Sequence, residues 1–383
     1  MIMERKKIVY VSGTRADFGL MTPVLKAIES SETLSLQVYS TGMHCMSAFG
    51  ATNAIVTGEF PTAKRIEVIF NGNTPSDTVK FIADLLSKIT DVFEMDRPDL
   101  VLLLGDRPEM LAVATACVYL GIPTAHLHGG ERTGTTDEIV RHAITKLSSL
   151  HFPATQDAAD RIKHMGEDEW RIQIVGAPAL DTILEAELPS KGEVASFVNL
   201  SNEEKFILLV QHPSGRVETV RDEIEETLSA LRKVALPVVA VYPNADAGSQ
   251  RIVEALEKEQ VNPLVRVFKN IPYKMFLAIE RDALVWIGNS SAALIESASF
   301  KTPVVDIGER QKGRLAGRNV IHAPHSRTHI LKAIEKCLHD TEYKTILQTV
   351  INPWGDGKTS VKVRDALEKL DGPERLVRKQ IAF

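Results

Sequence analysis

The sequence contains little cysteine, and the cysteines that it has are widely separated. Cys45, Cys117 and Cys337 are odd in number and show none of the close spacings that bind metal ions. This scarcity argues against a disulfide framework and against a zinc knuckle. It predicts a reducing, cytoplasmic environment.

Long apolar runs and an excess of positive charge are also missing. The longest apolar stretches reach about ten residues, well short of the roughly 20 that cross a bilayer. The first of them, KIVYVS, is too short for a secretory signal. Lys and Arg number 45 against 50 Asp and Glu, for a net charge of −5. We therefore expect a soluble protein with no membrane or nucleic-acid partner, in which any phosphate is bound by local groups.

What the chain does contain is a regular alternation of strands and helices over 383 residues, a length that suits two domains. The strands predicted in the first half are Lys7–Ser12, Leu34–Ser40, Arg65–Phe70, Asp99–Leu104, Thr124–Leu127 and Arg171–Val175. The helices predicted there are Leu20–Ile28, Asp77–Phe93, Pro108–Tyr119 and Ala158–Met165. The run DLVLLL is almost wholly apolar, which is typical of a strand buried on both faces of a parallel sheet.

A charged, loosely patterned stretch follows GAPALDTI and extends to about Glu204, and we interpret it as a linker. Beyond it, the predicted strands are Phe206–Val210, Pro237–Tyr242, Leu284–Ile287 and Pro303–Ile307. The predicted helices are Val217–Arg232, Gln250–Glu259, Ala292–Phe300 and Ser360–Leu370. The pattern predicts an α/β fold with two parallel-sheet, Rossmann-like domains at residues 1–185 and 186–358, and a helical tail at 359–383.

Polar motifs follow the strand ends of the first half, where parallel sheets bind their ligands. In SGTRADFG, Arg15 near a helix start would help to hold an anion, or would be a surface arginine in an ordinary turn. In LGDRPEM, Asp106 and Arg107 sit at the tip of the most apolar strand. The alternative for Asp106 is that it only caps the next helix.

The stretch HLHGGERTGTTDEIVRHA carries the densest titratable chemistry. His128 and Glu131 flank a glycine pair, and Asp137 precedes a predicted helix. His126 lies inside the strand and is interpreted as a core histidine. Several carboxylates sharing one small site push their pKa values apart, which suits general acid/base work. A metal site built from His128, Glu131 and His142 is an alternative, but its spacing matches no known metal motif.

The second half repeats this arrangement with groups suited to a nucleotide. VQHPSG places His212 after a strand, and YPNADAGS places Asn244 after the next. In WIGNSSAALIES, Ser290 and Ser291 at a helix start offer hydroxyl and N–H groups to a phosphate, and Glu296 could accept both hydroxyls of a ribose. GERQKGRLAGRNV adds a local positive cluster that includes Arg310. Helix caps, a structural histidine and a solvated glutamate are the alternatives.

Taken in order, these motifs resemble the UDP-N-acetylglucosamine 2-epimerase family, in particular its hydrolysing branch from sialic-acid-type sugar synthesis. The resemblance covers nearly the whole chain and includes GTRADFG, GDR, HGGERTGTTDEIVRHAITK, QHP, PNADAGS, GNSSAALIE, GERQKGR and NPWGDG. It implies the glycosyltransferase-B architecture, with two Rossmann-like domains facing a cleft and a C-terminal helix that packs on the first domain. A glycosyltransferase of the same fold and a non-catalytic nucleotide-sugar sensor are the competing interpretations.

The resemblance also implies a reaction and a set of site residues. The sugar loses its carbon-2 proton and its nucleoside diphosphate, and water then adds to the glycal, so that a free mannosamine derivative and UDP are released. The implied catalytic residues are Asp106, Glu131, Asp137, His212 and His128. The implied substrate-binding residues are Arg15, Arg107, His44, Asn244, Ser290, Ser291, Glu296 and Arg310. No metal and no cofactor are implied, the partner is a UDP-sugar, and a homodimer or homotetramer is expected.

One departure from the family pattern concerns the loop HLHGGE. Many members have a glutamate where this chain has His128. The carbon-2 base is therefore either His128 or Glu131. The sugar is either plain N-acetylglucosamine or a 2,4-diacetamido-6-deoxy relative, carried on UDP or GDP.

Overall fold

The computed structural model describes residues 5–46, 52–68, 74–133, 136–185, 187–214, 218–243, 248–370, 372 and 374–382. Asn244 lies outside these residues. The chain divides into two compact units. Unit 1 comprises Met1–Glu131, Thr136–Leu184 and Trp354–Phe383, and unit 2 comprises Arg132–Thr135 and Glu185–Pro353. The last 30 residues of the chain thus belong to the same unit as the first strand.

Unit 1 is a six-stranded sheet in which every neighbouring pair is parallel, in the order β3-β2-β1-β4-β5-β6. Its strands are β1 (Lys6–Ser12), β2 (Leu34–Ser40), β3 (Lys64–Arg65), β4 (Leu100–Leu104), β5 (Thr124–Leu127) and β6 (Leu150–Phe152). All five residues of β4 are buried, as the central strand of a sheet covered on both faces requires. The sheet order reverses between β1 and β4, so the ends of β1, β4 and β5 lie at a switch point.

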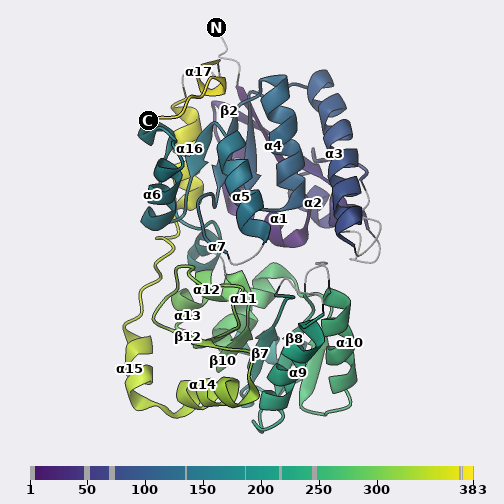
Figure 1. The fold of residues 1–383 in the computed structure, drawn as a ribbon, viewed down its shortest axis with the longest axis vertical. Helices are drawn as coiled ribbons and strands as arrows, with labels where there is room; N and C mark the ends of the chain where they lie inside the picture. Colours follow the sequence, from purple (N-terminus) through teal and green to yellow (C-terminus); the bar gives the residue numbers. More distant parts are fainter. Residues whose placement is uncertain are drawn as a thin grey trace. The chain divides into compact units, whose positions relative to one another are not determined.

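The helices of unit 1 cover this sheet in two groups (Figure 1). They are α1 (Arg15–Glu29), α2 (Asn53–Glu59), α3 (Pro75–Met95), α4 (Pro108–Leu120), α5 (Thr136–Leu147), α6 (Gln156–His164), α7 (Ala179–Glu185), α16 (Thr359–Glu368) and α17 (Glu374–Val377). α4 packs between α3 and α5, whereas α1 packs against α16 from the end of the chain. Thr14 is the N-cap of α1 and forms a capping box with Asp17. This capping box fixes the backbone where the loop after β1 enters the helix.

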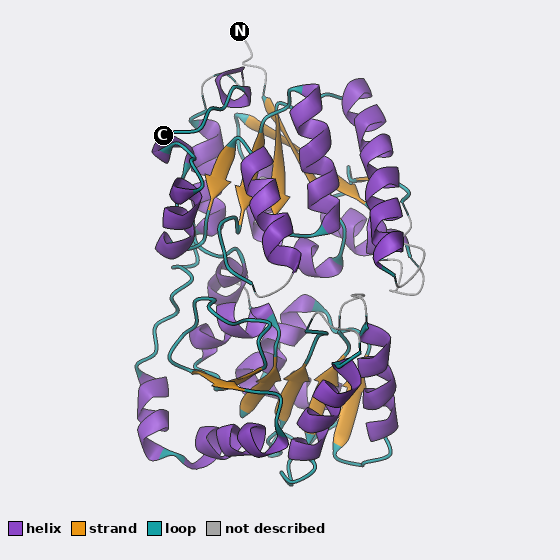
Figure 2. Ribbon diagram, in the orientation of Figure 1, coloured by secondary structure: helices purple, strands orange, loops and turns teal. Residues whose placement is uncertain are grey.

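Unit 2 repeats the architecture, with its parallel strands in the order β12-β11-β10-β7-β8-β9 (Figure 2). The strands are β7 (Ile207–Val210), β8 (Val238–Val241), β9 (Val265–Phe268), β10 (Val285–Gly288), β11 (Val304–Ile307) and β12 (Val320–Ala323). The helices are α8 (Lys191–Phe197), α9 (Val220–Leu231), α10 (Ser249–Glu259), α11 (Tyr273–Asp282), α12 (Ser291–Ile295), α13 (Ser297–Phe300), α14 (Arg327–His339) and α15 (Thr341–Gln348). Alternate residues of β7 face two separate apolar cores, Ile207 and Leu209 on one side, Leu208 and Val210 on the other.

The predicted α/β class with two parallel sheets is confirmed, but several element assignments were wrong. No strand forms at Arg171–Val175, where a short 3-10 helix and an isolated bridge from Ile172 to His151 stand instead. The sixth strand, β6, has the sequence LHF. It was not predicted because its central residue, His151, is polar and interrupts the apolar run. The predicted helix Ala292–Phe300 is broken at Glu296 into α12 and α13.

Two further expectations need correction. The strand expected at Arg65–Phe70 comprises only Lys64–Arg65, and residues 69 and 70 lie outside the described part. The stretch interpreted as a loose linker contains α8, which Ser190 starts with a capping box to Glu193. A capping box places polar residues at a helix start, so a short capped helix resembles a charged loop in sequence.

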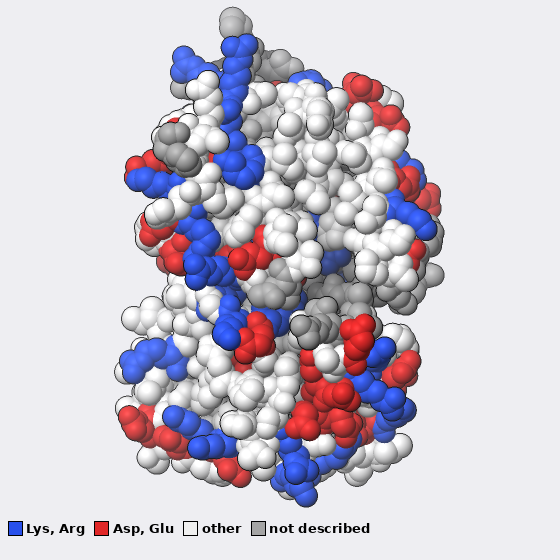
Figure 3. Space-filling view, viewed as in Figure 1, with Lys and Arg blue, Asp and Glu red and all other residues white. Residues whose placement is uncertain are grey.

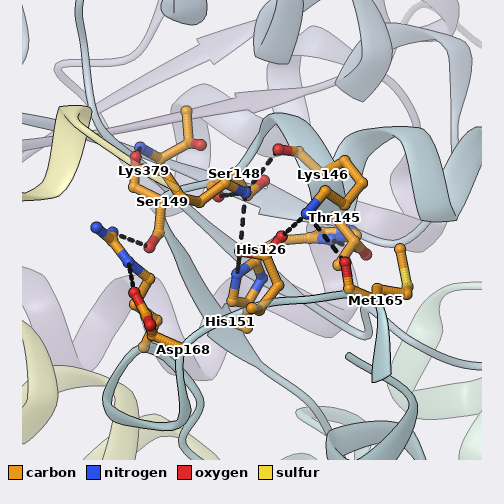
Figure 4. Close-up of polar contacts among 12 residues, drawn as sticks. His126, Thr145, Lys146, Ser148, Ser149, His151, Met165, Asp168 and Lys379 are labelled. Atoms are coloured by element: carbon orange, nitrogen blue, oxygen red, sulfur yellow. Dashed lines mark hydrogen bonds and ion pairs between the residues drawn. The ribbon is translucent and has the colours of Figure 1, made fainter. Parts of the chain in front are cut away.

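The C-terminal segment is attached to unit 1 by a buried ionic cluster. Glu167 is 1% exposed and contacts His151 at 3.0 Å, Lys379 at 2.9 Å and Lys146. Lys379 also donates to the backbone oxygens of Lys146 and Ser148 (Figure 4). Burial opposes ionisation of Glu167, but hydrogen bonds from His151, Lys146 and Lys379 outweigh it and lower its pKa to about 2.

The surface drawn in Figure 3 mixes charges of both signs. Acidic side chains gather over α9 and α10, and Lys and Arg are scattered elsewhere among uncharged and acidic neighbours. The face drawn therefore offers no broad basic surface. None of the helices in the described ranges is both long and apolar enough to cross a lipid bilayer.

Candidate functional site

A buried arginine gathers the carboxylates that follow β4 and β5 in unit 1. Arg141 of α5 is 4% exposed, pairs with the Asp106 carboxylate and donates to the backbone oxygen of Glu131 at 3.2 Å. Burial opposes the charge of Arg141, but Asp106, Glu131, Asp137 and Glu138 outweigh it and raise its pKa. Three of the predicted catalytic carboxylates thus share one fixed positive charge, and the interpretation of Asp106 as a simple helix cap fails, since Arg107 is the residue at the cap position of α4.

The loop HLHGGE forms a histidine–carboxylate pair. The Nδ1 atom of His128 hydrogen-bonds to the Glu131 carboxylate, and the two side chains are 10% and 2% exposed. A carboxylate only accepts hydrogen bonds, so Nδ1 carries the hydrogen and Nε2 of a neutral ring is left basic. The His128 ring lies 6.3 Å from the Trp354 ring, centroid to centroid. This pair has the orientation that activates a histidine as a general base.

The glycine pair lets this loop approach its neighbours closely. His128 has a φ of 57°, and Gly130 has a φ of 74°. A Cβ on Gly130 would lie 2.4 Å from the backbone oxygen of Ala158, so only glycine fits there. His126 below the loop is 0% exposed, with ring nitrogens bonded to Gly105 O at 2.7 Å and Thr145 Oγ1 at 3.2 Å. Burial lowers the pKa of His126 to about 3, and the expected core histidine is what the structure contains.

The groups near the end of β1 divide into a buried support and an accessible arginine. His44 is 0% exposed, and its ring nitrogens bond Ser12 Oγ at 2.9 Å and Thr52 Oγ1 at 2.8 Å. Both nitrogens are therefore occupied within unit 1, and the position suits a support better than the predicted ligand contact. Arg15 is the first residue of α1 and is half-buried, and this burial lowers its pKa.

Arg107 is held at the end of β4 by a buried glutamate that the motif search passed over. Its guanidinium donates to both oxygens of Glu109, at 3.1 and 3.3 Å. Glu109 is 2% exposed, and its carboxyl group lies 2.6 Å from where a Cβ on Gly13 would stand. Because Gly13 has no side chain, the Glu109 carboxylate has room beside the loop after β1. Glu109 in turn orients the Arg107 guanidinium.

In unit 2, one buried amide joins the ends of β7 and β10 to the loop after β11. Asn289 is 0% exposed, accepts from the backbone N–H of His212 at 2.7 Å and donates to the backbone oxygen of His212 at 2.9 Å. Its own backbone oxygen accepts from Arg310 and Gln311, each at 3.0 Å. His212 and Arg310, predicted from separate motifs, are therefore brought to one place by Asn289.

The serine pair follows directly on that amide. Ser290 occupies the cap position of α12, yet its side chain makes no capping hydrogen bond, so its hydroxyl is not used by the helix. Ser290 is 8% exposed, and Ser291 is half-buried at the first helical position. Backbone N–H groups at a helix start, next to hydroxyl groups that the helix does not use as caps, can hold a phosphate oxygen. Among the described residues, no group of three or more His, Cys, Asp and Glu side chains is placed to hold a metal ion.

The sequence pattern of one known protein family matches most of the chain. The family described as UDP-N-acetylglucosamine 2-epimerase matches residues 26–368. The chain belongs to the UDP-N-acetylglucosamine 2-epimerase family. The UDP-N,N′-diacetylbacillosamine 2-epimerase (hydrolyzing) of Legionella pneumophila is 38% identical over 99% of this chain and 100% of its own. The GDP/UDP-N,N′-diacetylbacillosamine 2-epimerase (hydrolyzing) of Campylobacter jejuni is 33% identical over 83% of this chain and 84% of its own.

Solved members of the UDP-N-acetylglucosamine 2-epimerase family share the fold. The crystal structure of the Neisseria meningitidis UDP-GlcNAc 2-epimerase, bound to UDP-GlcNAc, has a TM-score of 0.79 and is 20% identical. It covers 95% of this chain and 100% of that one. The sequence matches make this chain an enzyme of the family, and the solved structure shares the two-sheet architecture that the motifs predicted. Asn289 and Arg141 lie within two of the motifs that the chain shares with the family, GNSS and RHA. Neither residue was predicted from its own chemistry, but their place in these motifs could have identified them.

Proposed function

We propose that the chain is a hydrolysing 2-epimerase of a UDP-linked 2,4-diacetamido-6-deoxy sugar, which releases the manno-configured free sugar and UDP. The observation that carries the proposal is the buried pair of His128 and Glu131 after β5, in which a carboxylate holds a histidine as a base. Two relatives that match this chain over most of its length are named as hydrolysing 2-epimerases of N,N′-diacetylbacillosamine, which supports the same chemistry. Plain UDP-N-acetylglucosamine is the second candidate substrate, after the family description.

The first stage is an elimination that requires one base. In our proposal, Nε2 of His128 takes the carbon-2 proton, and Glu131 stabilises the imidazolium that forms. The electrons of the carbon–hydrogen bond form the double bond of the glycal, and the carbon-1 to oxygen bond breaks with its electron pair on UDP. A weakly acidic carbon needs both a base and stabilisation of the departing charge.

The second stage adds water across the double bond. The oxygen of water bonds to carbon 1 and releases one proton to the Asp106 carboxylate, and a proton is delivered to carbon 2 on the face opposite to the one that lost it. We assign this donor to Asp137, which shares the field of Arg141 with Asp106. Asp106, which pairs with Arg141, orients water and the sugar in this scheme.

The departing diphosphate is assigned to the groups that Asn289 assembles in unit 2. Ser290, Ser291 and Arg310 would donate to its oxygens, and His212 would protonate or hydrogen-bond the leaving oxygen. Glu296 would accept from the ribose hydroxyls. Arg15 and Arg107 are proposed as further contacts of the substrate. Asn244, outside the described residues, remains a proposed contact of the nucleotide on its motif alone.

Product analysis by NMR tests the proposed function. The protein is incubated with UDP-N,N′-diacetylbacillosamine and, separately, with UDP-N-acetylglucosamine, each with and without a sugar acceptor. We expect UDP and a free manno-configured sugar without any acceptor, faster from the diacetamido substrate. Retention of UDP on an epimerised sugar would indicate a non-hydrolysing epimerase, and acceptor-dependent release of UDP would indicate a transferase.

We also propose a homodimer or homotetramer that works in the cytoplasm, where nucleotide sugars are made and thiols stay reduced. The three cysteines are all free in the structure, in agreement with such a compartment. Light scattering coupled to size-exclusion chromatography gives the mass of the assembly. A monomer of 42.3 kDa at micromolar concentration would contradict this assignment.

We expect turnover to survive complete removal of metal ions. The proposed base, acid and diphosphate contacts are all protein side chains, so no step requires a Lewis acid. The measurement is the rate of UDP release after exhaustive EDTA treatment and gel filtration, compared with an untreated sample. Lost activity that zinc or manganese restores would contradict the proposal, whereas modest stimulation by magnesium is compatible with pairing to the diphosphate.

Ser291→Ala is expected to weaken UDP binding by about 2- to 13-fold, the equivalent of about 0.5–1.5 kcal/mol for one neutral hydrogen bond. Glu296→Ala should have a larger effect, because its contacts to the ribose are charge-assisted. Titration calorimetry with UDP gives both values. Ser299→Ala, on the neighbouring α13, is a matched control, and unchanged affinity in both test variants would remove these residues from the site.

A further inference from the structure

Two glutamate side chains are buried next to one another in unit 2. Glu280 of α11 is 0% exposed, and Glu296, at the junction of α12 and α13, is 3% exposed. α11 packs against α13, and the three helices are labelled side by side in Figure 1. Two carboxyl groups at this depth are not both ionised at neutral pH, because burial and mutual repulsion each oppose the second charge.

The immediate partners of this pair are few. The Tyr273 hydroxyl donates to Glu296 Oε1 at 3.4 Å. Among the described residues, neither carboxyl oxygen of Glu280 has a hydrogen-bond partner, and Oε2 of Glu296 has none. Two buried carboxyl groups that lack other donors can satisfy one another only if one of them keeps a proton and donates it to the other.

The surroundings indicate which glutamate keeps that proton. Burial, followed by the nearby Glu296, raises the pKa of Glu280 well above its ordinary value. Burial also raises the pKa of Glu296, to about 7, while hydrogen bonds from Glu280 and Tyr273 work in the opposite direction. Burial and the same carboxylates raise the pKa of Tyr273. Near neutral pH, Glu280 therefore keeps its proton and can donate it in a hydrogen bond, whereas Glu296 is the group that changes between its protonated and ionised forms.

Other charged groups on the packed elements are turned to solvent or already paired. On α8, Lys191 and Glu193 are exposed, and Glu193 caps its own helix. On α11, Lys274 is exposed, and Arg281 forms an ion pair with Asp282. α12 and α13 carry no charged residue between their ends, and Lys301 after α13 is exposed. No cation is thus seen to neutralise the pair among these described groups.

We propose that Glu280 is a positioning residue for the nucleotide, which as a neutral donor holds the Glu296 carboxylate ready for the ribose hydroxyls and makes UDP affinity depend on pH near neutrality. The inference rests on the ribose role given to Glu296 under the proposed function. A protonated Glu296 has one acceptor oxygen fewer and no charge, so it binds two hydroxyls less well. UDP affinity should therefore fall as the pH drops below about 7.

The experiment measures the dissociation constant of UDP between pH 5.5 and 8.5 for the wild type and for three variants, Glu280→Gln, Glu280→Met and Glu296→Gln. Glutamine has the shape of a protonated glutamate and keeps a donor, whereas methionine keeps the length and offers none. Ionisation of the phosphate near pH 6 is the same for all four proteins and cancels in their ratios. Thermal unfolding of each variant reports whether the fold is retained.

We expect the advantage of the wild type over Glu296→Gln to be at least about tenfold at pH 8.5 and to vanish toward pH 5.5, since each pH unit below the pKa removes tenfold of the ionised form. Glu280→Gln should follow the wild-type profile within about threefold at every pH. Glu280→Met should bind about fivefold more weakly at pH 7 and recover at higher pH, because loss of the donor moves the titration of Glu296 upward by about one unit and lowers its ionised fraction at pH 7 from about one half to about one tenth.

Three outcomes would overturn the inference. Identical profiles for Glu280→Gln and Glu280→Met would reduce Glu280 to a packing role. A Glu280→Gln variant as weak as Glu280→Met would mean that Glu280 acts as an anion. Absence of UDP binding by the wild type at every pH would overturn the inference together with the proposed function, whereas normal UDP-sugar hydrolysis with either of the first two results overturns the inference alone.

Discussion

Glu131→Gln is expected to lower turnover at least a hundredfold while UDP still binds. Glu131 is 3% exposed, and its carboxylate accepts from Nδ1 of His128. A glutamine can turn its NH₂ group toward Nδ1, which favours the tautomer with the hydrogen on Nε2 and removes the proposed base. One general acid/base group is worth roughly 10²–10⁴-fold in rate. Steady-state rates of UDP release and calorimetry with UDP separate loss of chemistry from loss of binding.

Companion variants assign the two stages. His128→Ala should abolish wash-in of deuterium at carbon 2 of recovered substrate, because the proton is no longer removed. Asp137→Asn should also lose at least about a hundredfold in turnover, but as the proposed second-stage donor it should leave the elimination intact and release the glycal. Exchange that persists in His128→Ala and is lost in Glu131→Gln would transfer the role of base to Glu131. Near-normal turnover in Glu131→Gln would falsify the pair as the reacting unit.

The parts of the site that could be predicted from sequence are those that follow buried strands. The run DLVLLL and the short strand TAHL identify β4 and β5 because parallel strands buried on both faces are apolar. Every strand of a parallel sheet ends at the same edge, so Asp106, Glu131 and Asp137 were placed in one neighbourhood without any knowledge of contacts. The structure adds the reason that they can coexist, which is Arg141, 35 residues from its partner Asp106.

Contacts between residues that lie far apart in the sequence could not be predicted from the sequence. The Asn289 side chain bonds the backbone of His212, 77 residues away, and nothing in either motif alone names the other. His44 shows the same limit. The family resemblance implied a substrate contact for His44, which stays a prediction, and only the structure shows that Ser12 and Thr52 bond both of its ring nitrogens. Glu280 stands in an ordinary amphipathic helix, and only the packing of α11 on α13 reveals its buried neighbour.

Glu167→Gln is expected to destabilise unit 1 by about 3–5 kcal/mol, the usual result of removing one partner from a buried ionic cluster. Glu167 is 1% exposed, and the change leaves Lys379, itself partly buried, and Lys146 without their counter-charge. Arg171, which donates to backbone oxygens of Leu376 and Arg378, becomes the main remaining anchor of the C-terminal segment. Urea unfolding, combined with hydrogen exchange of the segment at residues 374–382, measures both the global and the local effect.

The matched control for that change is Glu169→Gln, two residues along the chain. Glu169 pairs with Lys163 at 2.9 Å, but its side chain is 81% exposed, and solvent-exposed pairs contribute about 0–1 kcal/mol. The difference in unfolding free energy between Glu167→Gln and Glu169→Gln should also depend on pH. The pKa of Glu167 is lowered from 4.5 to about 2 in the folded protein, so its stabilising contribution is complete above pH 4.5 and is lost as the pH falls toward 2. Equal unfolding free energies for Glu167→Gln and Glu169→Gln at pH 7 would show that the buried cluster does not hold the C-terminal segment in place.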